Sequence, residues 1–407
     1  MLTLSCLVIV VAFGVPASAV SSTDFERFGN RVRSLEAGTF PPEEPNDLGV
    51  IEFNFAQDRY ELHFLPIPTF RQLLDIPPDS SCLENRYFRI VEFKVVSFNA
   101  RPRELLDACL PLTDFDGRNV LYHLMKAARF FENLHDFQAP ISQRQIIVRV
   151  RADRAWSRPD HVGLREEFNN AYYLPADAEG RWNEELWFYR SRPTIHWKGV
   201  LAQVAPFILP KPGLKLGLLP FFVARNGDSG VDSAKVPSVI YHEAFHWAAD
   251  QLGLVPASPF GTPLADAFCD YFSASILGKG IVGGLNAFMD PKRSKRIDRL
   301  RPLRSAAHNL VRNLAKERNA HLRSPFVPSV MWSLRTKLGT AQMDAIAWQA
   351  LVELRGNYTF RALPKALQDA TAKTADNKTV LEHVETVLAR RDVTRSFDYL
   401  DSLYSSD

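Results

Sequence analysis

Residues 238–250 read SVIYHEAFHWAAD, and this stretch decides how the rest of the chain is interpreted. Within it, His242, Glu243 and His246 form the pattern HExxH. Residues four apart share one face of a helix, so both imidazoles can bind one zinc ion, and Glu243 then lies beside the metal as a general base. The pattern predicts a helix over 238–252 that carries a catalytic metal site. The alternative is a purely structural helix in which the HExxH residues bind no metal.

A second stretch of the sequence offers a candidate for the third zinc ligand. Catalytic zinc sites use three protein ligands and leave the fourth position open. Asp266 follows His246 by twenty residues, and Asp270 follows four later, inside a predicted helix over 264–277. We therefore expect Asp266 to complete the Zn²⁺ ligands. Asp270 is the candidate acceptor for the free ring N–H of a ligand histidine, which would fix the orientation of that ring.

These offsets resemble the thermolysin-like metallopeptidases, a gluzincin family. In that family HExxH precedes a Glu ligand by twenty residues, and an Asp follows the Glu by four. The resemblance implies a zinc-dependent endopeptidase acting on peptide or protein substrates, with a central HExxH helix. It also includes the acidic residue Asp250, one turn beyond His246.

Three shorter matches extend the resemblance to residues that contact substrate. Residues 168–172, FNNAY, resemble the family's edge strand, which implies substrate binding by Asn170 and Ala171. Residues 319–324, NAHLRS, resemble the segment that supplies an oxyanion-stabilising histidine, here His321. Arg304 resembles the arginine that contacts a substrate carbonyl. A solvated basic face over 292–304 is the alternative for Arg304.

Two departures from the family bear on activity. Asp266 replaces Glu and is shorter by about 1.5 Å, one carbon–carbon bond. Either the two helices pack closer together, or the site binds zinc less well. The family also places an oxyanion-stabilising tyrosine eleven residues after the second histidine, where this chain has Ala257. The alternative function is therefore a catalytically weakened thermolysin-like fold that acts as a secreted binding or surface protein.

The periodicity of apolar residues predicts an α+β fold. Alternating runs at 50–55, 60–64 and 87–96 predict strands, so residues 20–114 form a β-rich N-terminal domain or a pro-region. A helix over 121–137, a strand over 145–150, a loop-rich stretch and the HExxH helix belong to a zinc-binding catalytic domain over 115–290. Prolines interrupt the apolar run 200–223, which predicts a flap, an inserted hairpin or a surface excursion. Residues 291–407 are predicted to form a helical domain, with helices at 329–337, 341–355, 360–374 and 378–391.

The N-terminal sequence and the net charge of the chain indicate its cellular location and its partners. Residues 1–19 form an apolar run ending in Ala17-Ser18-Ala19, as in a cleavable secretory signal, so a secreted or periplasmic location is expected. The run lacks a preceding Lys or Arg, and an uncleaved anchor or a misplaced start codon is the alternative. No later stretch is predicted to span a membrane. A net charge of +3 argues against nucleic acid as the main partner.

The cysteines beyond the signal are odd in number, so they cannot all pair. Cys82 and Cys109 would close a moderate loop, and both a disulfide and two thiols are compatible with the sequence. Cys269 lies in an apolar helical run, which favours a buried thiol over a nucleophile.

Overall fold

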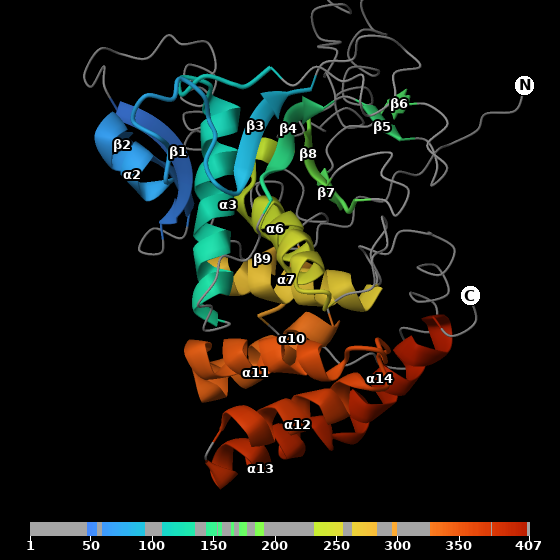
Figure 1. Ribbon diagram of the computed structural model, residues 1–407. Coiled ribbons are helices and arrows are strands. Elements are labelled where there is room, and N and C mark those ends of the chain that lie inside the picture. Colours follow the sequence, from blue (N-terminus) through green and yellow to red (C-terminus); the bar gives the residue numbers. More distant parts are fainter. Residues whose placement is uncertain are drawn as a thin grey trace, which may run out of the picture. The chain divides into compact units, whose positions relative to one another are not determined.

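A computed structural model describes residues 47–54, 59–93, 108–134, 144–152, 154–156, 164–166, 171–176, 184–190, 232–254, 263–282, 295–298, 326–375 and 377–404. Helices and strands both contribute, which confirms the α+β class (Figure 1). All described residues belong to one compact unit, Asn46–Asp407. None of the helices described is both long and apolar enough to cross a membrane. The predicted signal at 1–19 and the proline-interrupted run at 200–223 lie outside the described residues.

The described chain begins with an antiparallel hairpin of β1 (Asp47–Asn54) and β2 (Arg59–Pro66). This pair confirms the strands predicted at 50–55 and 60–64. A short helix, α2 (Ile67–Leu73), follows with a proline in its first turn, a position that proline tolerates because the N–H there has no helical partner. The hairpin packs on α3 (Phe115–Leu134).

The main sheet has four strands in the order β3 (Phe88–Glu92), β4 (Ile146–Ala152), β8 (Glu185–Tyr189) and β7 (Ala171–Leu174). The first three are parallel, and β7 pairs antiparallel at the edge. Helix α3 makes the crossover between β3 and β4, as a parallel pair requires. Two further antiparallel pairs are β5 (Arg154–Trp156) with β6 (Leu164–Glu166), and β9 (Ile281–Val282) with β10 (Lys295–Arg296).

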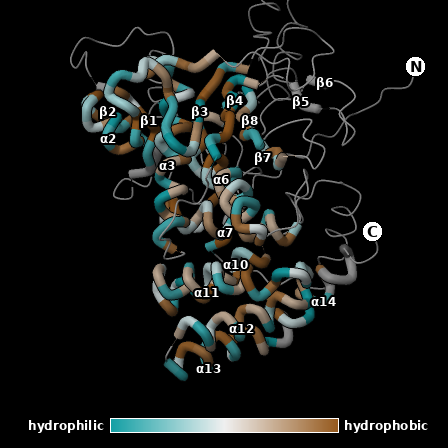
Figure 2. Tube along the Cα trace, viewed as in Figure 1, coloured by the Kyte–Doolittle hydropathy of each residue, from teal (hydrophilic) through white to brown (hydrophobic). Residues whose placement is uncertain are grey.

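The loop-rich interpretation of the stretch after 150 was wrong for β8. All five residues of this strand are buried, so its sequence shows no alternation of apolar and polar residues. Parallel strands covered on both faces lose the alternation of apolar and polar residues. Figure 2 shows hydrophobic colouring on part of the neighbouring strand β4, which Arg149 and Arg151 interrupt. Trp187 and Tyr189 of β8 join Phe93, Ala152 and Leu174 in one core cluster.

The remaining elements are helical: α6 (Pro237–Gln251), α7 (Pro263–Leu277), α10 (Phe326–Leu338), α11 (Thr340–Glu353), α12 (Leu363–Thr374), α13 (Lys378–Leu388) and α14 (Arg391–Tyr404). Six of them match the predicted helices to within a few residues. Helix α14 was not predicted, although Val393, Phe397 and Leu400 are buried at helical spacing. The domain boundaries at 114/115 and 290/291 stay predictions.

Two local features correct or complete the sequence analysis. Helix α3 begins six residues earlier than predicted, because Asp114 Oδ1 accepts a hydrogen bond from the Gly117 N–H at 2.8 Å and caps the first turn. Cys82 and Cys109 form a disulfide with Cα atoms 5.7 Å apart. This bond decides between the two alternatives left open by the sequence.

Candidate metal centre

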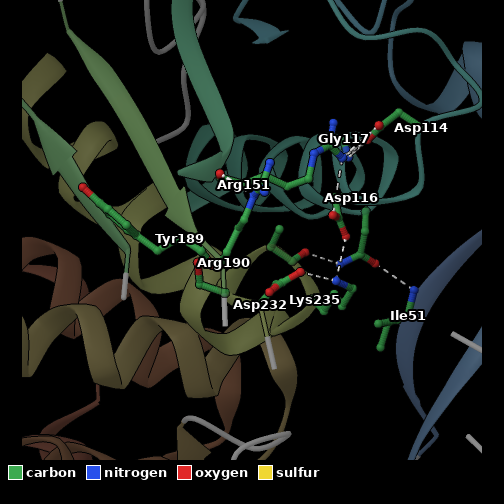
Figure 3. A network of polar contacts seen from close by, with 12 residues as sticks. Ile51, Asp114, Asp116, Gly117, Arg151, Tyr189, Arg190, Asp232 and Lys235 are labelled. Carbon is green, nitrogen blue, oxygen red and sulfur yellow. Dashed lines mark hydrogen bonds and ion pairs between the residues drawn. The ribbon is translucent and has the colours of Figure 1, made fainter. Parts of the chain in front are cut away.

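The turn that leads into α6 is held by a polar network at the N-terminal end of α3 (Figure 3). A 3₁₀ turn, η3 (Ser233–Lys235), leads into α6, and Lys235 Nζ pairs with Asp116 Oδ1 of α3 at 3.2 Å. The Asn119 side chain donates to the carbonyl of Ala234 at 2.7 Å and accepts from the Ile51 N–H at 2.8 Å. These bonds fix where the HExxH helix starts relative to α3 and β1.

The C-terminal end of α6 is closed by a glycine cap. Gly253 has φ of +58°, and the N–H groups of Gly253 and Leu254 donate to the carbonyls of Asp250 and Ala249. Arg355, which follows α11, donates to the carbonyl oxygens of Leu252 and Gly253 at 2.6 and 3.2 Å. The helix end is thereby hydrogen-bonded to the C-terminal part of the chain.

Acid–base groups also connect α6 to its neighbours. Tyr173 of β7 donates to Asp250 Oδ2 at 2.6 Å, so the residue that matched the family's acidic position holds the edge strand against α6. His123 of α3 contacts the Tyr241 hydroxyl and the Ile51 carbonyl, each at 2.7 Å. Since a carbonyl only accepts, Nε2 of His123 carries the proton. Burial, then the charge of Lys126, lowers the pKa of His123 to about 3.

This buried histidine predicts a loss of stability in acid. An unfolded histidine takes up a proton below its usual pKa of about 6.5, whereas His123 stays neutral down to about 3, so the unfolded state binds more protons and stability falls with pH. Between pH 7 and 5 the wild type should lose about 2 kcal/mol more than His123→Gln. Urea unfolding at both pH values measures the difference. Equal losses in the two proteins would show that His123 does not contribute.

An aromatic cluster packs α6 against α7 and its surroundings. Phe245 stacks on Phe272 of α7 with ring centroids 5.0 Å apart, and Phe131 of α3 contacts both rings at 5.8 Å. On another side, Trp247 meets Phe88 of β3 edge-on at 4.9 Å. Large buried rings of this kind leave α6 little freedom to shift, because each displacement would open a cavity.

Within this frame, α6 and α7 bring four metal-ligating groups together. The side chains of His242 and His246 from α6 and of Asp266 and Cys269 from α7 each offer one ligand atom, and these atoms lie within 4.8 Å of one another. Asp266 Oδ1 is 3.4 Å from His246 Nε2 and 4.0 Å from His242 Nε2. Asp266 lies in the first turn of α7, where the helix dipole favours a negative charge. This group can bind a metal ion.

Asp270 orients the first histidine of the group. Its Oδ1 lies 3.0 Å from His242 Nδ1, so the ring donates from Nδ1 and leaves Nε2 on the side of Asp266. Burial lowers the pKa of His242, but Asp270, and after it Glu243 and Asp266, raise it above its usual value. The surplus of buried negative charge that causes this shift is the electrostatic environment that a cation needs.

The structure describes some of the remaining predicted site residues and not others. Glu243 is buried next to His242 in the α6 sequence. Ala171 begins β7, the edge strand of the main sheet, and β7 packs against α6. Asn170, His321, Arg304 and Ala257 lie outside the described residues, so their roles stay predictions.

The sequence did not reveal that Cys269 and Tyr358 lie near the site. Cys269 is buried, as predicted, but its sulfur belongs to the metal-ligating group, and its spacing of three residues from Asp266 was the available signal. Tyr358 lies between α11 and α12, and its buried hydroxyl makes no hydrogen bond to a described residue. Burial, with Cys269 and Asp266, raises the pKa of Tyr358 well above its usual value. No local pattern links Tyr358 to α7.

No family model and no curated protein matches the chain. The structure itself defines a buried group of two histidines, one aspartate and one cysteine that can bind a metal ion.

Proposed function

We propose that the chain is a secreted zinc-dependent endopeptidase of the thermolysin-like type, with His242, His246 and Asp266 as the metal ligands. The observation that carries this proposal is the juxtaposition of Asp266 with both histidines of HExxH, on two helices that the aromatic cluster packs together. Asp266 is near enough to His246 that the shorter side chain does not by itself prevent ligation.

The ligand set favours zinc among common metal ions. Zinc binds imidazole, thiolate and carboxylate, whereas calcium and magnesium bind mainly oxygen ligands. Two imidazoles, one carboxylate and one thiol fit the first preference. When bound, zinc supplies a Lewis acid that polarises a carbonyl and makes water more acidic.

The proposed mechanism gives the chain's own residues separate roles. Glu243 accepts a proton from the attacking water and later gives it to the leaving amine nitrogen. Asp270 keeps His242 in the tautomer that presents Nε2. A donor to the oxyanion is expected from His321.

The substrate class is an extended peptide or a protein. An edge strand can pair with an extended peptide through its main chain, which suits β7 and gives Asn170 and Ala171 their substrate-binding role. Arg304 is assigned to the same task by resemblance. The run ending in Ala17-Ser18-Ala19 and the Cys82–Cys109 disulfide both support export, because disulfides persist in oxidising compartments.

One observation favours the second candidate function, a catalytically weakened secreted binding or surface protein. Structural zinc sites use four protein ligands, and Cys269 places a fourth potential ligand in the group. A site filled in this way would retain the metal without exposing it to substrate.

Metal analysis of the purified full chain, combined with a broad peptide-library cleavage assay, tests the proposal. We expect one zinc ion per chain and peptide cleavage that a chelator abolishes and added zinc restores. Bound zinc without cleavage of any peptide would favour the second function. A chain that binds no zinc would contradict both.

A further inference from the structure

We infer that the Cys269 thiolate is the fourth ligand of the bound metal in the resting protein, and that the chain is latent until this ligand leaves. The inference rests on the proposed function and specifies how that site is regulated. It concerns the one member of the metal-ligating group to which the peptidase mechanism gives no role.

The spacing of the four ligand atoms supports coordination by sulfur. In a tetrahedral zinc site with bonds of about 2.0 Å to nitrogen and about 2.3 Å to sulfur, neighbouring ligand atoms lie about 3.3 to 3.5 Å apart. The four atoms here already lie within 4.8 Å of one another, so side-chain rotations that move these atoms by about an ångström would complete the site. Asp266 and Cys269 share one face of α7, so a metal held by Asp266 is within reach of the thiol.

The surroundings also favour the thiolate over water. Cys269 is fully buried, and Asp266 and His242 are nearly so. A metal ion deprotonates a coordinating thiol, with the proton released to solvent. Four protein ligands use the usual coordination number of zinc, which leaves no position for water. The resting site is therefore closed.

The same residue can open the site without a change in the fold. A cysteine side chain turns about a single bond, so the sulfur can leave the metal while α7 stays in place. His246, with 15% of its side chain exposed, is the most accessible of the three predicted ligands and marks the side from which a peptide would approach. Hydrolysis is then limited by the fraction of molecules in which the sulfur has left.

X-ray absorption at the zinc edge tests the coordination directly, with no reference to activity. We expect one sulfur scatterer at about 2.3 Å from zinc in the wild type and none in Cys269→Ala. The matched control is Ser273→Ala, which removes a buried side-chain atom one turn further along α7 and its 2.5 Å hydrogen bond to Ser238 but keeps the four ligands. It should retain the sulfur. A wild-type spectrum with only nitrogen and oxygen neighbours would overturn the inference.

Peptide hydrolysis by the same three proteins tests the latency. Removal of Cys269 should raise kcat/KM by about tenfold or more, while the control stays near the wild type. If Cys269→Ala fails to fold, Cys269→Ser, which nearly preserves the volume, replaces it. A sulfur scatterer with no rise in hydrolysis would overturn the latency. Full zinc occupancy with no hydrolysis by any variant would instead contradict the peptidase function and leave the coordination result standing.

Discussion

Glu243→Gln is expected to lower kcat for peptide hydrolysis by about 10² to 10⁴, the contribution of a general base, while the zinc content stays at the wild-type level. The amide has nearly the shape of the carboxylate but cannot accept the proton of the attacking water. The conservative change matters because Glu243 is buried, and a shorter side chain would leave a cavity.

The matched control for this variant is Asp250→Asn, the same carboxylate-to-amide change two turns further along α6. Asp250 accepts a hydrogen bond from Tyr173 and does not belong to the metal-ligating group, so its substitution should cost much less activity. Wild-type activity in Glu243→Gln would remove Glu243 as the base. Loss of zinc from that variant would place Glu243 among the ligands instead.

Asp266→Ala is expected to remove most of the metal affinity, because it takes away the carboxylate ligand that lies close to both histidines. Asp270→Asn changes only the acceptor for His242 Nδ1 and should weaken binding by about 10- to 100-fold. Competition with a chromophoric chelator measures both affinities. The variant that loses more metal affinity identifies the aspartate that binds the metal. A larger loss of affinity in Asp270→Asn than in Asp266→Ala would exchange the roles of these aspartates.

Asp266→Glu separates a tight site from a loose one. The four ligand atoms already lie within 4.8 Å of one another, and Asp266 is buried. We therefore expect the extra methylene to crowd the group and to reduce activity. Higher zinc affinity in this variant would mean that the aspartate is too short for its position.

The helices and the central pair of the site could be predicted because both depend on local spacing. Positions four apart share a helix face, so His242 with His246, and Asp266 with Asp270, could be placed without knowing how the helices pack. Strand β8 could not be recognised in this way, because burial on both faces removes the alternation that marks a strand.

The rest of the site depends on packing between distant segments. Cys269 was recognised as buried, but its approach to His242 and His246 is set by the contact of α6 with α7. The position of Tyr358 relative to Asp266 depends on the turn between α11 and α12. Nothing in the sequence predicts the hydrogen bond between His123 and Tyr241, since the two residues lie on different helices. Tertiary contacts of this kind have no local periodicity.

The hydrogen bonds of Arg355 to the carbonyls of Leu252 and Gly253, just beyond α6, have a consequence for how the molecule comes apart. Together with the hydrogen bonds of Tyr271 and Ser275 of α7 to Asp344 of α11, they tie both metal-site helices to the C-terminal helices. Local opening of a protein follows cooperative units of this kind. The metal site and α11 therefore share one such unit, and a chain that ended before α11 would leave the end of the HExxH helix to fray.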